Sequence, residues 1–178
     1  HFFNPPRYMK LLEIVPGPDT LPEVLAFMVK FCEDVLGKGV VVCKDVPNFI
    51  GNRIGVFDIA NAMRLMVEKD MTIEEVDTIV GKELGRPGTA LFGTVDLVGL
   101  DTAIHVMTHL YEAVTDDEMR DLYRPAGFLE AMLEKKLLGD KTGRGFYRKT
   151  KNEKGEKVKE ALDYKTMAYV PLIKPRFP

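Results

Sequence analysis

Cysteine is scarce in this sequence of 178 residues, which contains only Cys32 and Cys43. Two cysteines are too few for a disulfide scaffold, and no Asn-x-Ser/Thr glycosylation acceptor occurs. A reducing, cytoplasmic compartment is therefore expected. No apolar run approaches the roughly 20 residues of a membrane-spanning helix, so no membrane span is expected either.

Several nucleotide-binding and metal-binding motifs are also missing. The Gly-x-Gly-x-x-Gly pattern of dinucleotide-binding folds does not occur, because Gly37-Lys38-Gly39 and Gly143-Arg144-Gly145 each lack the third glycine. There is no Walker-type phosphate loop, no Cys-x-x-Cys pair and no His-Glu-x-x-His helix. His105 and His109 stand one helical turn apart, but no third ligand accompanies them. We therefore predict no metal site.

The charge balance argues against a nucleic-acid partner. The 25 Lys and Arg residues are offset by 27 Asp and Glu residues, and the formal net charge is -2. This balance is not that of a dedicated binder of nucleic acid or anionic membranes. Basic residues gather between Lys135 and Lys159, and nucleic-acid binding through them is an alternative that rests on this run alone. Such runs are more often a solvated face.

The N-terminal part of the chain has the pattern of a strand, a helix and a second strand. The segment 9–15 is predicted as a strand that Pro16-Gly17-Pro18 ends. Asp19 or Thr20 is expected to cap a helix that Gly37 terminates. A valine strand follows at 39–43, of the kind that is buried in parallel sheets. These elements predict a βαβ unit from the end of a doubly wound sheet.

The chain is expected to be a piece of a longer protein. A lone βαβ unit cannot cover its own strands. The sequence also opens at His1, without an initiator Met or a secretory apolar stretch.

A mainly helical region is expected after a boundary at 44–47. Its long first helix is predicted over 48–69, with Asp45 or Asn48 as the cap. Thr72 and Glu75 have the spacing of a capping box at the start of a helix over 72–84. Three further helices are predicted, over 91–97, 101–115 and 127–137.

The predicted organisation has three parts and a mainly α fold class. Residues 1–44 form the end of an α/β sheet, residues 45–148 form an all-helical domain, and residues 149–178 form a tail or linker. Within the tail, short strands over 158–162 and 167–172 are an open possibility.

The helix over 48–69 is apolar on more than one face. One stripe contains Ile50, Ile54, Phe57 and Leu65, and a second contains Phe49, Val56, Ile59, Met63 and Met66. One stripe can pack within a small domain, whereas the other needs a partner. We expect a homodimer through this helix. The alternative is that another module of a longer parent protein stacks on the second stripe.

Three polar residues stand where a purely structural sequence does not require them: His1, Glu13 and Asn52. A histidine can take a proton from an alcohol near neutral pH, and a carboxylate on its other ring nitrogen fixes the tautomer. An amide nearby can hold the substrate oxygen. These are the parts needed to oxidise an alcohol with a hydride acceptor.

Each of the three residues also has a plainer interpretation. His1 is compatible with a remnant of a purification tag, and Glu13 with the solvated face of a strand. Asn52 is compatible with an exposed position near the start of a helix. Spacing alone does not decide among these interpretations.

Four sequence blocks occur in order along the chain. They are His-Phe-Phe-Asn-Pro-Pro-x-x-Met-x-Leu-x-Glu at 1–13 and the segments 44–53, 96–101 and 139–147. Together they resemble the L-3-hydroxyacyl-CoA dehydrogenase family, and they cover the chain from residue 1 to residue 148. The run 85–93 and the end of the chain are more similar to the long fused enzymes of fatty acid β-oxidation than to the short dehydrogenases.

The resemblance implies an NAD-dependent oxidation of (S)-3-hydroxyacyl-CoA to 3-oxoacyl-CoA. It implies the end of a Rossmann domain followed by a helical C-terminal domain of the 6-phosphogluconate dehydrogenase type. His1 is implied as the general base, Glu13 as its partner and Asn52 as the amide on the substrate side. Asn4 matches a position near the nicotinamide, and is implied as a cofactor-binding residue.

The resemblance also limits what this chain can do alone. The family's nucleotide-binding glycine loop has no counterpart among these residues, so the chain by itself is expected to be inactive. Two alternatives to the fatty-acid enzyme remain at this point. One is a related dehydrogenase that oxidises a 3-hydroxy acid without CoA, and the other is an assembly module without chemistry.

Overall fold

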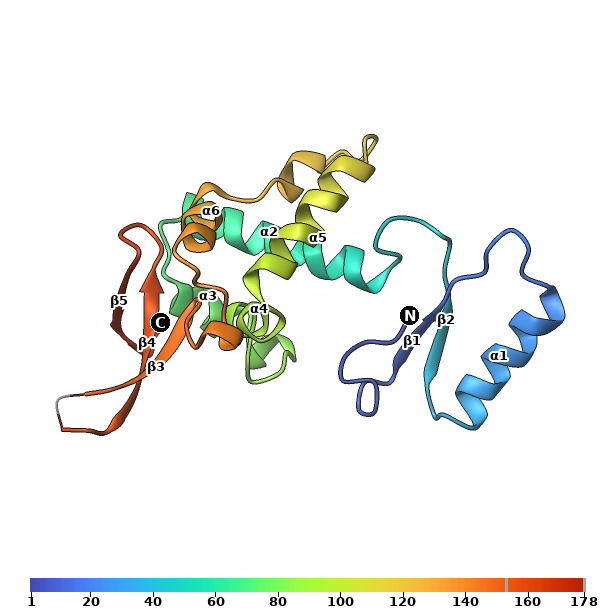
Figure 1. The fold of residues 1–178 in the computed structure, drawn as a ribbon, viewed down its shortest axis with the longest axis horizontal. Coiled ribbons are helices and arrows are strands. Elements are labelled where there is room, and N and C mark those ends of the chain that lie inside the picture. Colours follow the sequence, from blue (N-terminus) through green and yellow to red (C-terminus); the bar gives the residue numbers. More distant parts are fainter. Residues whose placement is uncertain (153, 178) are drawn as a thin grey trace. The chain divides into compact units, whose positions relative to one another are not determined.

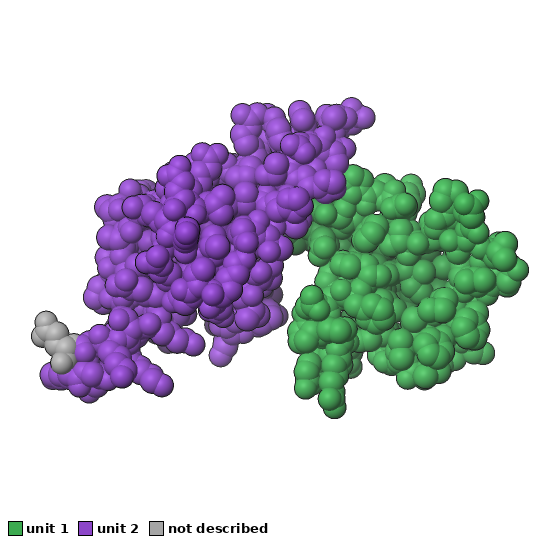
Figure 2. Space-filling view, viewed as in Figure 1, with its two compact units in different colours: residues 1–55 green, residues 56–178 purple. Residues whose placement is uncertain are grey.

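A computed structural model describes residues 1–152 and 154–177 of the chain. Contacts divide the chain into two compact units, residues 1–55 and residues 56–178 (Figures 1 and 2). Helices make up most of the regular structure, which confirms the mainly α fold class. Among the helices of the described ranges, none combines the length and apolar character that crossing a bilayer requires.

Unit 1 contains the predicted strand–helix–strand arrangement. Strand β1 (Leu11–Ile14) pairs in parallel with β2 (Gly39–Val42), in a register that sets Glu13 opposite Val41. Helix α1 (Pro22–Asp34) makes the crossover that parallel pairing requires. Strand β1 is shorter than the predicted 9–15 because regular pairing with β2 covers only Leu11–Ile14.

The start of α1 differs from the prediction. Neither Asp19 nor Thr20 caps it: the helix begins after Leu21 with Pro22, and no side chain caps its first turn. The Thr20 hydroxyl instead accepts a hydrogen bond from the Gly17 amide at 2.9 Å. That hydroxyl closes the turn before the helix, so it is not available as a helix cap.

Unit 1 leaves much apolar surface uncovered. Cys32 of α1 is buried, whereas Phe27 on the same helix is 65% exposed. Val41 and Val42 of β2 are also exposed. One helix on a two-stranded sheet cannot bury both faces of the strands, as the sequence predicts for a lone βαβ unit.

Helix α2 (Gly51–Glu68) begins later than the predicted 48–69. Asn48 and Phe49 both have a left-handed backbone, with φ angles of 62° and 47°. A right-handed helix cannot run through two such residues. Asn48 is therefore part of a turn that leads into the helix, and the predicted caps Asp45 and Asn48 are wrong.

Unit 2 is built around a helical core. Met63 and Met66 of α2 pack with Phe92 and Val95 of α4 (Phe92–Val98). The surrounding helices are α3 (Ile73–Ile79), α5 (Leu100–Ala113) and α6 (Gly127–Glu134). Short 3-10 turns lie at Lys82–Leu84 (η1), Arg120–Tyr123 (η2) and Asp140–Thr142 (η3).

The capping box predicted at the start of α3 is present. The Thr72 hydroxyl accepts from the Glu75 amide at 3.2 Å, and the Glu75 carboxylate accepts from the Thr72 amide at 2.8 Å. The helix ends at Ile79, and the last part of the predicted 72–84 segment forms the separate turn η1. A capping box thus marks where a helix begins but not how far it extends.

The stretch after residue 148 is folded rather than a plain tail or linker. Strands β3 (Tyr147–Lys151), β4 (Lys157–Asp163) and β5 (Ala168–Pro171) form an antiparallel sheet in the order β3-β4-β5. Leu162 of β4 belongs to the helical core. The possible strands at 158–162 and 167–172 are therefore present. In β4, the exposed Lys157 and Lys159 interrupt the apolar pattern in the sequence.

Candidate active site

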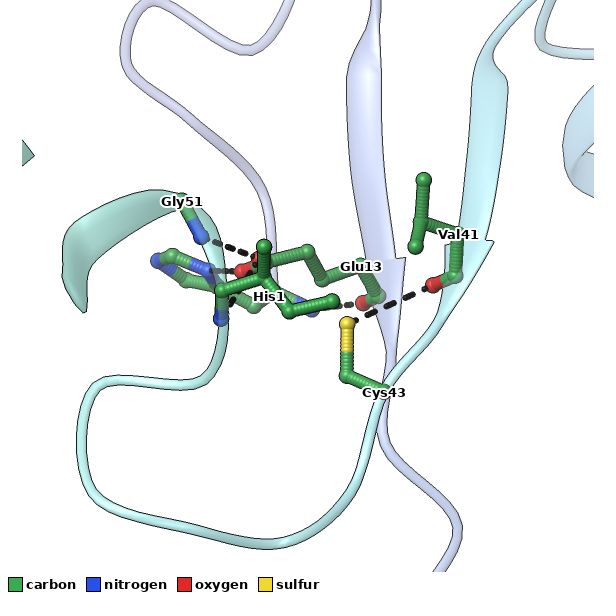
Figure 3. Close-up of polar contacts among 6 residues, drawn as sticks. His1, Glu13, Val41, Cys43 and Gly51 are labelled. Carbon is green, nitrogen blue, oxygen red and sulfur yellow. Dashed lines mark hydrogen bonds and ion pairs between the residues drawn. The ribbon is translucent and has the colours of Figure 1, made fainter. Parts of the chain in front are cut away.

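His1 and Glu13 lie side by side in unit 1 (Figure 3). Nδ1 of His1 and Oε2 of Glu13 are 2.6 Å apart. Their main chains are paired as well: the Glu13 amide donates to the His1 carbonyl at 3.1 Å, and the main-chain nitrogen of His1 donates to the Glu13 carbonyl at 2.7 Å. Strand β1 thus fixes both residues, and the structure brings together two of the predicted site residues.

The carboxylate of Glu13 is deeply buried and fully partnered. Glu13 is 1% exposed, which excludes the solvated-face interpretation. Its Oε1 accepts hydrogen bonds from the amides of Ile50 at 3.1 Å and Gly51 at 2.6 Å. These amides open helix α2, where the helix dipole favours a negative charge. Burial of a carboxylate is tolerated when such donors replace water.

Two aromatic rings pack against the imidazole of His1. The ring centroids of Phe3 and Phe49 lie 4.6 Å and 5.5 Å from that of His1, both in tilted arrangements. These contacts restrict the rotation of the imidazole. Because Glu13 engages Nδ1, proton exchange with any substrate falls to Nε2.

Cys43 is a neutral neighbour of the pair. It directly follows β2, is buried, and its Sγ donates to the Val41 carbonyl at 3.7 Å (Figure 3). Burial, and then the charge of Glu13, raise the pKa of the Cys43 thiol above its ordinary value. The thiol therefore stays protonated and is not an activated nucleophile.

Asn52 and Asn4 also lie in unit 1. Asn52 is the second residue of α2 and is half-buried, and Asn4 is exposed. In the described chain, neither side chain hydrogen bonds with His1 or Glu13. Their substrate and cofactor roles remain predictions.

Unit 2 contains two further carboxylates with main-chain partners, the buried Asp96 and the half-buried Asp77. Asp96 accepts hydrogen bonds from the Phe146 and Tyr147 amides, both at 2.8 Å, and burial raises its pKa to about 6. Asp77 accepts from the Phe92 amide and from the Tyr147 hydroxyl, both at 2.8 Å, and burial raises its pKa as well. Because each carboxylate holds a neighbouring backbone segment in place, these residues support the fold.

No metal centre is evident in the residues that the structure covers. Within them, no group of three or more His, Cys, Asp or Glu side chains is placed to hold a metal ion. His105 and His109 are both exposed on α5.

Sequence reasoning missed four residues that shape the site: Phe3, Phe49, Ile50 and Gly51. Ile50 and Gly51 act through main-chain amides, which any residue but proline supplies. Side-chain chemistry therefore gives no signal for them. A glycine at the first position of a helix is the one local clue, because it suggests close packing against another group.

Comparison with known families gives two adjoining matches. The NAD binding domain of 3-hydroxyacyl-CoA dehydrogenase matches residues 1–46. The C-terminal domain of 3-hydroxyacyl-CoA dehydrogenase matches residues 49–149.

Individual relatives agree with these matches. A probable 3-hydroxyacyl-CoA dehydrogenase of Bacillus subtilis is 47% identical over 95% of this chain and 21% of its own length. A putative fatty acid oxidation complex trifunctional enzyme of Rickettsia prowazekii is 33% identical over 98% of this chain and 24% of its own length. The crystal structure of (S)-3-hydroxybutyryl-CoA dehydrogenase from Ralstonia eutropha matches with a TM-score of 0.70 and 34% identity, over 82% of this chain and 49% of that one. The chain thus spans less than half the length of each.

Proposed function

This chain belongs to the 3-hydroxyacyl-CoA dehydrogenase family, and from that premise we propose an activity for the full-length protein that carries it. The proposed activity is NAD-dependent oxidation of (S)-3-hydroxyacyl-CoA to 3-oxoacyl-CoA in fatty acid β-oxidation. The observation that supports it most is the 2.6 Å contact between His1 and the buried carboxylate of Glu13. Alcohol oxidation needs a group that removes the hydroxyl proton, and an oriented histidine is suited to that task.

The contact suggests how the chain's own residues act. Glu13 accepts a hydrogen bond from the Nδ1–H of His1, which leaves the lone pair on Nε2. Nε2 takes the proton of the 3-hydroxyl, and the Glu13 carboxylate stabilises the imidazolium that forms. Bound NAD supplies the hydride acceptor. Asn52 is proposed to hold the substrate oxygen, and Asn4 to lie near the nicotinamide.

Unit 1 fits part of an NAD site. Its parallel β1–α1–β2 unit is of the type found in dinucleotide-binding sheets. These residues contain no Gly-x-Gly-x-x-Gly loop to receive a pyrophosphate. We propose that other parts of the full-length protein supply that loop.

We further propose that the helical unit forms a homodimer through α2. Ile54 is 64% exposed and Leu65 is exposed, whereas Met63 and Met66 of the second stripe are buried. Phe57, which the sequence places in the same stripe as Ile54 and Leu65, packs against the small cluster around Leu110 instead. An exposed apolar row on a long helix is a surface that a symmetric partner can cover. Relatives that include a trifunctional enzyme make stacking on a second module of the parent the competing arrangement.

We propose the cytoplasm as the compartment. Cys32 and Cys43 are both free thiols, which suits a reducing environment.

A substrate panel tests the proposed activity. The full-length protein is supplied with NAD and either (S)-3-hydroxybutyryl-CoA or free 3-hydroxybutyrate, and NADH formation is followed by absorbance. We expect saturable NADH formation with the thioester and little with the free acid. Equal turnover of the free acid would support a CoA-independent dehydrogenase, and no turnover of either would support an assembly module.

A further inference from the structure

The His1–Glu13 pair depends on how helix α2 begins. The Ile50 and Gly51 amides hold Oε1 of Glu13, which leaves Oε2 directed at His1. The two preceding residues, Asn48 and Phe49, have left-handed backbones. Non-glycine residues rarely take this conformation, and where they do the surrounding structure imposes it. Here the turn aims two amides at Glu13 and sets the Phe49 ring beside His1.

Gly51 stands at the most crowded point of this arrangement. A Cβ atom at this position would lie 2.5 Å from Cζ and 3.0 Å from Cε1 of Phe3, and 3.5 Å from Oε1 of Glu13. The first of these distances is shorter than any contact that a Cβ atom makes with a non-bonded carbon. The Phe3 ring in turn packs on the His1 imidazole, with centroids 4.6 Å apart. A side chain at position 51 must therefore displace either the ring that contacts His1 or the amides that hold Glu13.

We propose that Gly51 is a positioning residue for the His1–Glu13 pair: its missing side chain lets the Phe3 ring and the first amides of α2 close on the pair together. The consequence for catalysis rests on the proposed function. The effect on the pair itself does not, because it follows from contacts within unit 1.

The proposal has an electrostatic consequence. Amide donors favour the charged carboxylate, so loosening them makes the pair hold its proton more tightly. An alanine at position 51 therefore raises the pH at which His1 loses its proton. The other titratable group beside the pair is the thiol of Cys43, which follows β2. The substitution does not alter this thiol.

The test compares Gly51→Ala with Gly55→Ala in the full-length protein. Gly55 lies one turn further along α2, and a Cβ there meets nothing within 4 Å. The His1 ring is followed by NMR on histidine-labelled protein and assigned by its loss in His1→Gln. We expect Gly51→Ala to move the His1 titration upward by about one pH unit. Gly55→Ala should leave it unchanged. Equal titrations in the two variants would overturn the proposal.

A double variant tests the role of Phe3. Phe3→Leu in the Gly51→Ala background removes the ring atoms that the new Cβ meets. We expect the His1 titration to move back toward its original position, even where Gly51→Ala alone does not fold. If the double variant shows no such return, or also fails to fold, the steric argument is wrong.

The pH profile of kcat/KM for (S)-3-hydroxybutyryl-CoA separates the two proposals. With Gly51→Ala, its acidic limb should move in step with the NMR titration, and kcat should fall by about tenfold. If Gly51→Ala only reduced the amount of folded protein, kcat/KM would fall equally at every pH and its acidic limb would stay in place. A shifted titration in a protein that never reduces NAD would support the role of Gly51 and contradict the proposed function. If the protein reduces NAD but Gly51→Ala leaves the His1 titration unchanged, the proposed function is supported and the role of Gly51 is contradicted.

Discussion

A histidine on a mobile segment makes a poor base, because few of its orientations face a substrate. In this chain the His1 imidazole is held on three sides, by Glu13, Phe3 and Phe49. The carboxylate that orients it is held in turn by two main-chain donors, the amides of Ile50 and Gly51. The geometry therefore favours one tautomer and one ring orientation before any substrate arrives.

Glu13→Gln tests this support at the level of one residue. We expect kcat of the full-length protein to fall by roughly 10²-fold, because a neutral amide cannot stabilise the imidazolium. Glu33→Gln is the matched control, since Glu33 is exposed on α1. Steady-state kinetics with (S)-3-hydroxybutyryl-CoA decide. If Glu13→Gln turns over as fast as Glu33→Gln, the carboxylate does not assist the histidine.

The side chains of this site could be predicted from the sequence, but the main-chain amides that hold Glu13 could not. His1 and Glu13 could be selected because their chemistry depends on residue type. The helix start that holds Glu13 could not, because it depends on the left-handed turn at Asn48 and Phe49. Both residues more often adopt right-handed or extended backbones, so their identities do not reveal the turn.

Asp96 joins two separate sequence blocks at the scale of structural elements. It lies on α4 in the block 96–101, and it accepts the amides of Phe146 and Tyr147 in the block 139–147. Gly145 is required beside it, since a Cβ there would collide with the Asp96 carboxylate. The two blocks thus form a single joint between a helix and strand β3.

This joint gives unit 2 a pH-dependent stability. Asp96 is 5% exposed, and burial raises its pKa from the ordinary 3.8 to about 6. Between these values the folded state binds a proton that the unfolded chain has lost. The contribution of Asp96 to the free energy of unfolding is therefore full below about pH 4 and is lost as the pH rises through about 6.

Asp96→Asn removes this titration. We expect the unfolding free energy of the original protein, relative to that of the variant, to fall by up to roughly 3 kcal/mol between about pH 4 and pH 7. Asp77, whose pKa is also raised, is present in both proteins and cancels. Urea unfolding at several pH values measures the difference. A difference that stays constant or grows with pH would show that Asp96 does not titrate in this way.

Element boundaries show the same limit of sequence reasoning. The capping box of α3 was predictable, because both halves are side chains at a fixed spacing. The start of α1 was not, because the Thr20 hydroxyl has two possible amide partners and takes the one in the preceding turn. Strands β4 and β5 were left as a possibility because exposed lysines interrupt the apolar pattern of β4 and because β5 has only four residues.

At the scale of the whole molecule, the chain lacks the glycine loop of a complete NAD site. We expect residues 1–178 to show no binding of NAD at micromolar concentrations by calorimetry. No Gly-rich loop is present to receive the pyrophosphate, and nothing in unit 1 replaces it. A clean saturable isotherm in that range would show that unit 1 carries a sufficient cofactor site.

The proposed dimer is tested by sedimentation equilibrium of the same chain. We expect self-association that Leu65→Asp abolishes, because Leu65 lies in the exposed row of α2. Leu84→Asp is the matched control, since Leu84 is 67% exposed on η1 and is not part of that helix. Phe57 is unsuitable for this purpose because it packs against the Leu110 cluster. A strict monomer up to high micromolar concentration, or equal effects of the two variants, would rule out α2 as the dimer contact.

The assignment of His1 as the base underlies the whole account. The most direct measurement is the steady-state rate of NADH formation from (S)-3-hydroxybutyryl-CoA by the full-length protein and its His1→Ala variant. A positioned general base contributes on the order of 10²- to 10⁴-fold, and its loss affects the transition state more than substrate binding. We therefore predict a fall of that size in kcat with a much smaller change in KM. A variant that keeps a near-normal kcat would contradict the account.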